Sequence, residues 1–70
     1  MKVYLQIVDS NTGIYQCGMI EEPVIKNQEI ANALGHFGIQ IGSLSWIFKN
    51  EKYGIAEVDG TSKICTLIYL

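Results

Sequence analysis

The chain has no arginine, and its five basic residues are all lysines. Arginine is the side chain that most often reads phosphate and guanine, because its planar fork donates two parallel hydrogen bonds. The lysines are scattered along the chain among seven acidic residues, and the formal net charge is −2. A nucleic-acid-binding domain carries a basic face. The charge pattern therefore argues against binding to DNA or RNA.

Residues that serve as metal ligands or nucleophiles are also scarce. The chain has one histidine, His36, and two cysteines, Cys17 and Cys65, which lie far apart and lack the paired spacing of a zinc site. Both cysteines fall in predicted strands, where a buried thiol behaves as a small hydrophobic group. His36 falls at the end of a predicted helix, where it interacts favourably with the helix dipole. We expect no metal and no cofactor.

Two further patterns fail as catalytic or phosphate-binding sites. Glu21 and Glu22 are adjacent in a predicted strand, so their side chains point to opposite faces and form no carboxylate pair. Gly35, Gly38 and Gly42 follow a predicted helix and lead into a strand, whereas a phosphate-binding loop leads from a strand into a helix. The sequence therefore predicts that the protein is not an enzyme.

Long apolar runs are absent as well. No stretch reaches the length of a membrane span, and the first residues alternate in polarity, unlike the apolar core of a signal peptide. Two cysteines are too few for a disulfide scaffold. We expect a cytoplasmic protein with reduced thiols and no membrane contact.

What is present indicates a folded domain. Apolar residues make up 49% of the 70 residues and charged residues only 17%, the opposite of a disordered chain. This length corresponds to a single domain over residues 1–70, near the lower limit for a fold without disulfides or metal. With so few charges, some apolar surface should stay exposed in a monomer.

The periodicity of apolar residues predicts five strands and one helix. Alternating patterns, separated by turn-forming residues, predict strands over residues 2–10, 14–22, 38–50, 53–60 and 63–70. The order β-β-α-β-β-β predicts an α+β domain. We expect an antiparallel sheet, made of an N-terminal hairpin beside a three-stranded meander, with one helix packed on one face.

The helix is predicted between residues 26 and 38. Asn27 is the expected N-cap and Gly38 the glycine that stops the helix. The residues expected to share its apolar face are Ile30, Ala33, Leu34 and Phe37. In the preceding strand, Gly18 predicts a bulge or a close backbone approach.

The last strand is apolar on both faces, as are several others. One helix covers only one face of a sheet, and a chain of this length has no second layer of its own. We therefore predict that another polypeptide covers the second face, most simply a second copy in a two-fold dimer. The alternative is that the last strand lies mid-sheet between neighbours of the same chain. The predicted oligomer interface is Ile64, Thr66, Leu67, Ile68, Tyr69 and Leu70.

Aromatic residues supply the remaining functional signal. Tyrosine and tryptophan are enriched at binding hot spots, and Tyr15, Trp46 and Tyr53 lie near predicted turns or at amphipathic positions. We predict that these three contact a partner.

The favoured function is a small non-enzymatic interaction domain, an inhibitor or adaptor that binds a larger protein through a sheet surface. Antitoxins and accessory proteins of viruses and mobile elements belong to this class. One alternative is an oligomer that binds a nucleotide-like ligand at its subunit interface, with aromatic residues stacking on the base and lysines holding the phosphates. The other alternative is a structural module of a larger assembly.

Overall fold

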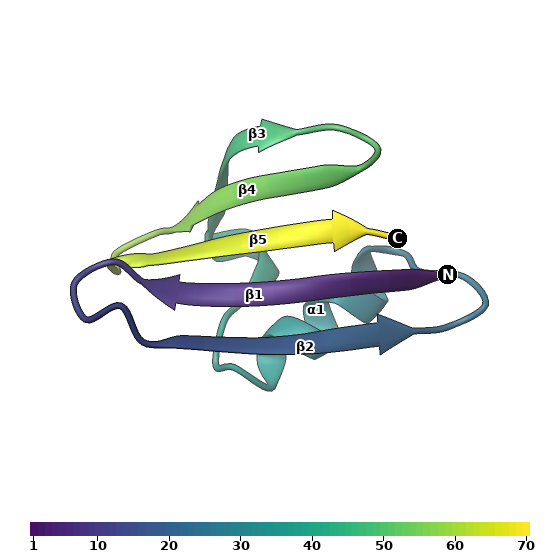
Figure 1. Ribbon diagram of the computed structural model, residues 1–70, viewed down its shortest axis with the longest axis horizontal. Coiled ribbons are helices and arrows are strands. Elements are labelled where there is room, and N and C mark those ends of the chain that lie inside the picture. The colour runs from purple at the N-terminus through teal and green to yellow at the C-terminus, as the bar shows by residue number, and fades with distance from the viewer.

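The computed structural model describes all 70 residues and forms one five-stranded sheet in the order β2-β1-β5-β4-β3 (Figure 1). The elements are β1 (Lys2–Asp9), β2 (Tyr15–Glu21), α1 (Asn27–Gly35), the 3₁₀ turn η1 (Ile41–Ser43), β3 (Leu44–Lys49), β4 (Tyr53–Val58) and β5 (Lys63–Tyr69). Every neighbouring pair of strands is antiparallel. The predicted α+β class and the order β-β-α-β-β-β are confirmed. The hairpin β1–β2 joins the meander β3–β4–β5 through β5, which lies in the centre.

The core lies between the sheet and α1. Side chains alternate between the two faces of a strand, so every second residue of β1, β4 and β5 points toward the helix. The buried core consists of Val3, Leu5, Ile7, Ile30, Leu34, Ile39, Leu44, Ala56, Val58, Cys65 and Leu67. Ile30 and Leu34 are the buried residues of α1, with Ala33 and Phe37 partly buried beside them. The predicted apolar face of the helix is confirmed.

The turns at one end of the sheet are tied together by Asp9. The Asn11 backbone N–H donates to its carboxylate at 2.9 Å, and the Ser62 hydroxyl donates at 2.8 Å. The Ser62 hydrogen bond is the largest cause of a lowered pKa for Asp9, followed by the Asn11 backbone. This carboxylate therefore connects the β1–β2 turn to the β4–β5 turn.

The N-terminal end of α1 differs by one residue from the prediction. The N-cap is Lys26 and not Asn27: the Lys26 backbone N–H donates to the Glu29 carboxylate at 2.8 Å. The helix ends at Gly35, before Gly38, which adopts a left-handed φ of 73° in the loop that follows. There the Ile39 N–H donates to the Leu34 carbonyl at 3.0 Å. The Gly38 N–H also donates to the Gly35 carbonyl at 3.0 Å, so Gly38 is the left-handed glycine that stops the helix, as predicted.

The third strand is shorter than predicted. Residues 41–43 form η1, and β3 begins only at Leu44. A bulge then shifts the register, so that Trp46 pairs with Ala56 while Phe48 pairs with Ile55. Trp46 consequently lies on the helix side of the sheet and Phe48 on the opposite side.

Gly18 shows neither of the predicted features, and a side chain packs against it instead. The Phe37 ring lies 3.5 Å from the position that a Cβ on Gly18 would occupy. The β1–β2 register runs from Lys2–Glu21 to Val8–Tyr15 without a shift, so there is no bulge.

Candidate protein-binding face

One face of the sheet has no covering layer. The helix lies behind the sheet in Figure 1, and no element of the chain passes in front of it. The side chains on this side, here called the open face, alternate with the buried ones along each strand. They are Lys2, Tyr4, Gln6, Val8, Tyr15, Cys17, Met19, Glu21, Ser45, Phe48, Tyr53, Ile55, Glu57, Ile64, Thr66 and Ile68.

The strand register arranges the open face in rows that run across the sheet. One row is Met19, Tyr4, Ile68 and Tyr53; the next is Cys17, Gln6, Thr66, Ile55 and Phe48; the third is Tyr15, Val8, Ile64, Glu57 and Ser45. Directly opposite residues in such rows have Cβ atoms about 4.5–5.5 Å apart. The side chains of each row therefore contact one another and form a continuous surface.

Large apolar side chains of this surface reach solvent. Tyr15 is 61% exposed, Met19 53% and Phe48 47%. The Phe48 and Tyr53 rings stack, with centroids 5.2 Å apart and an interplanar angle of 28°. Monomeric proteins rarely expose apolar patches that span several strands, and such patches mark interaction sites.

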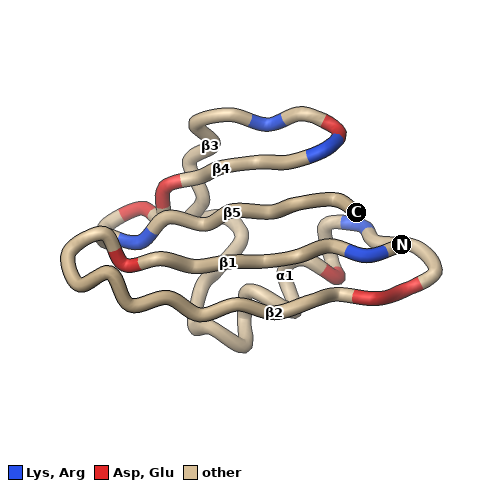
Figure 2. The backbone as a smooth tube through the Cα atoms, in the orientation of Figure 1, with Lys and Arg blue, Asp and Glu red and all other residues tan.

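The open face is almost free of charge. Its charged residues are Lys2 and Glu21, paired at one corner, and Glu57. Figure 2 shows that charged residues gather toward the ends of the strands and in the loops, while the middle of β1, β2 and β5 has none. The neighbouring Cys17 side chain, followed by desolvation, raises the pKa of Tyr4 above its usual value. A partner for this face should itself be largely uncharged.

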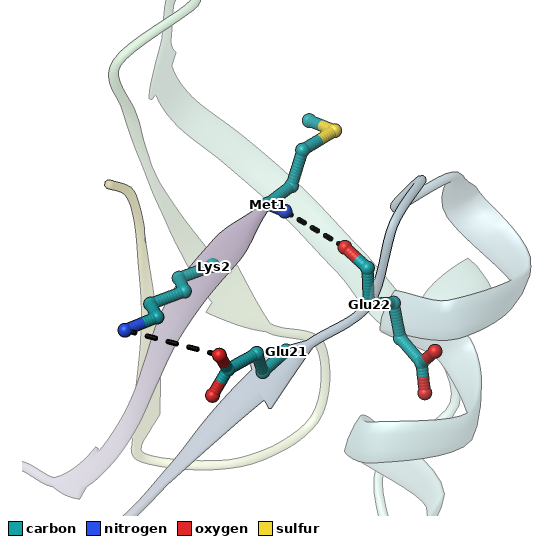
Figure 3. Close-up of polar contacts among 4 residues, drawn as sticks. All are labelled: Met1, Lys2, Glu21 and Glu22. Atoms are coloured by element: carbon teal, nitrogen blue, oxygen red, sulfur yellow. Dashed lines mark hydrogen bonds and ion pairs between the residues drawn. The ribbon is translucent and has the colours of Figure 1, made fainter.

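One corner of the open face is bordered by charged groups. The Lys2 ammonium lies 3.9 Å from the Glu21 carboxylate, and the Met1 amino group donates to the Glu22 carbonyl at 2.8 Å. In Figure 3 the Glu22 carboxylate lies beside the helix, away from the Lys2–Glu21 pair. Exposed ion pairs of this kind contribute little stability. They delimit the apolar surface.

The three aromatic residues predicted to bind a partner do not share one patch. Tyr15 and Tyr53 both lie on the open face, but two strands, β1 and β5, and one row lie between them, so they are about 20 Å apart. Trp46 lies on the opposite face, where its ring packs over Gly54 and the Lys49 ammonium lies 4.6 Å from the ring centroid.

Other residues of the open face were absent from the predicted site. Tyr4, Met19, Phe48 and Ile55 join Tyr15 and Tyr53 there. Their alternation with buried residues was visible in the sequence. What the sequence lacked was a sign of which of the two apolar faces the helix covers.

The predicted interface residues of the last strand divide between the two faces. β5 pairs with β1 on one side and with β4 on the other, as in the mid-sheet alternative. Leu67 is buried in the core, and Tyr69 packs against it on the same side. Ile64, Thr66 and Ile68 lie on the open face, and Leu70 is exposed beyond the strand end. Only part of this strand is available to a partner, and only through its side chains.

The histidine and the cysteines lie apart from one another. Cys17 is exposed on β2, while Cys65 is buried in β5, where desolvation raises its pKa to about 11. His36 is exposed at the end of α1. No group of three or more His, Cys, Asp or Glu side chains has the arrangement needed to hold a metal ion.

The two surface cavities lie on the helix side of β2. The larger, about 450 Å³, lies between β2 and α1, and its charged lining residues are the acids Glu21, Glu22 and Glu29. The smaller, about 230 Å³, is lined by residues that include Asp9 and Lys63. A cavity lined by three carboxylates and no lysine repels phosphate, which disfavours nucleotide binding there.

No known protein family, curated protein or solved structure matches this chain. The model contains no helix with the length and apolarity required to cross a membrane.

Proposed function

We propose that this protein is a non-enzymatic interaction domain, an inhibitor or adaptor, that binds a larger protein through the open face. The observation that supports this proposal is the continuous, nearly uncharged surface of aromatic and aliphatic side chains that no part of the chain covers. In layered folds, each apolar sheet face is buried against another element. For the open face, the covering element comes from the larger protein.

The dimensions of the open face suit one such layer. Five strands at about 4.8 Å spacing, over about 20 Å of strand length, give roughly 500 Å² in plan. Side-chain relief increases the accessible area toward the roughly 800 Å² that each partner buries in a stable complex. A sheet face or a pair of helices from the partner fills this area.

The tyrosines give the surface a means of selection. Tyr4, Tyr15 and Tyr53 present hydroxyl groups among the apolar side chains of this face. A buried tyrosine hydroxyl needs a hydrogen-bond partner, so a binding protein must place polar groups opposite these three positions. A protein whose surface lacks such polar groups leaves the three tyrosine hydroxyls unpaired and therefore binds more weakly.

Site-specific photo-cross-linking tests the proposal. A photoreactive amino acid is placed at Ile68, in the open face, and in a matched control at Gln28, an exposed position of the helix. In the cells that naturally contain the protein, we expect a discrete covalent adduct with one larger protein from position 68 and none from position 28. Equal adducts from both positions, or none from position 68, contradict binding through the open face.

A further inference from the structure

A second interaction surface is the outer edge of β2. This strand ends the sheet, and only β1 pairs with it. The bonds at the two ends of the hairpin fix which groups are free: the Asp9 N–H donates to the Ile14 carbonyl at 2.9 Å, and the Glu22 N–H donates to the Met1 carbonyl at 3.1 Å. Bonded pairs alternate along an antiparallel ladder. The residues that direct their N–H and C=O groups outward are therefore Tyr15, Cys17, Met19 and Glu21.

The two edges of the sheet differ in how they are protected. Natural proteins protect edge strands with bulges, lysines and prolines, since an unprotected edge pairs with other chains. The β3 edge has both a bulge beside Ile47 and a lysine, Lys49. The β2 edge has seven residues in unbroken register, and no charge or proline from Tyr15 to Ile20. This contrast between the two edges favours pairing of the β2 edge with another strand.

We propose that β2 pairs antiparallel with β2 of a second copy of this chain, with Gly18 on the two-fold axis. In this register Cys17 lies opposite Met19 of the second copy, and Tyr15 lies opposite its Glu21. All four residues with outward groups then bond to a counterpart. The sheet becomes continuous across both copies, and a two-fold axis perpendicular to it keeps both open faces on the same side.

Charge and shape favour a second copy as the occupant. In the antiparallel arrangement the acidic Glu21–Glu22 end of one strand meets the neutral Tyr15 end of the other, so no like charges face each other. On the helix side, Phe37 packs beneath Gly18 and is only partly buried. Because Gly18 lies on the axis, the Phe37 rings of the two copies meet there and cover each other's exposed edges.

A cysteine placed on β2 tests the register. Opposite residues of a bonded pair have Cα atoms about 5.5 Å apart, within disulfide range, whereas diagonal neighbours are about 7–8 Å apart. Oxidation of the Met19→Cys variant should therefore give a covalent dimer through Cys17 of the other copy. The matched Met19→Cys/Cys17→Ser variant leaves only diagonal thiols and should stay largely uncoupled. Equal coupling in both variants, or none in either, overturns the proposed pairing.

Sedimentation tests the association without any covalent bond. The wild-type chain should sediment at twice its 7.8 kDa mass. The Met19→Lys variant should sediment as a monomer at the same concentration, because a lysine on the edge opposes strand pairing. The Ile47→Lys variant alters the other edge and should remain dimeric. A monomeric wild-type chain, or a Met19→Lys dimer as stable as the wild type, contradicts the proposal. Neither experiment involves the larger partner, so the outcome is independent of the function proposed for the open face.

Discussion

Adjacent residues of β5 should respond very differently to the same substitution. Leu67 points into the core and is 1% exposed, whereas Ile68 lies on the open face and is 38% exposed. Leu67→Thr removes two buried side-chain carbons, which lowers the free energy of unfolding by roughly 1.6 kcal/mol at about 0.8 kcal/mol per buried methylene. It also buries an unpaired hydroxyl, at a further cost of about 1–3 kcal/mol. The expected loss is about 3–5 kcal/mol, comparable with the total stability of about 3–10 kcal/mol for a domain of this size.

Ile68→Thr keeps a β-branched side chain in a strand and leaves its hydroxyl in contact with water. The expected loss is about 1 kcal/mol or less. Urea denaturation of both variants, followed by Trp46 fluorescence and far-ultraviolet circular dichroism, gives the two free energies of unfolding. Equal losses, or a larger loss for Ile68→Thr, would refute the assignment of the two faces.

Three further predictions concern single sites. Gly54→Ala places a Cβ 2.7 Å from Cζ3 of Trp46 and should cost about 1–3 kcal/mol; in denaturation experiments on a Trp46→Leu background the same change should cost much less. Gly35→Ala, at the last residue of the helix with open space around it, should stabilise the fold by up to about 0.5 kcal/mol. Gly38→Ala, at a φ of 73°, should destabilise it by about 1 kcal/mol, and thermal melts with no difference between the two variants would contradict the assigned backbone. Burial raises the pKa of Cys65 to about 11. Its thiol therefore contributes stability fully below about pH 9 and loses that contribution between about pH 9 and pH 11, because the same thiol ionises at lower pH in the unfolded chain. In thermal melts recorded across that pH range, a Cys65→Ala variant should lack this part of the pH dependence.

Much of the fold was predictable because local patterns and packing agree. Residues 2–8 alternate in polarity and form β1, and the spacing of Ile30 and Leu34 places both on the buried side of α1. The third strand was predicted less well. Ile39 and Ile41 alternate with polar residues as a strand would, yet Ile39 is buried in a loop and Ile41 begins η1. Their burial beneath the sheet depends on tertiary contacts that a two-residue period does not report.

The candidate site was predictable only in part. The apolar character of both sheet faces was evident from the sequence. The bulge between Trp46 and Phe48 was not evident, and it places Phe48 on the open face while Trp46 stays with Leu44 on the helix side. Without the register, Tyr15 and Tyr53 could not be placed on one face with Tyr4, nor Trp46 separated from them.

The most direct test of the open face as a binding surface is the affinity of the cross-linked partner for two lysine variants. Thr66 lies at the centre of the open face, and Gln28 is exposed on α1. If the open face binds the partner, Thr66→Lys should weaken binding by about 100-fold or more, as expected for a charge buried at the centre of an interface. Gln28→Lys should leave the affinity unchanged. A folded Thr66→Lys variant that binds as tightly as the wild type would contradict the proposed function.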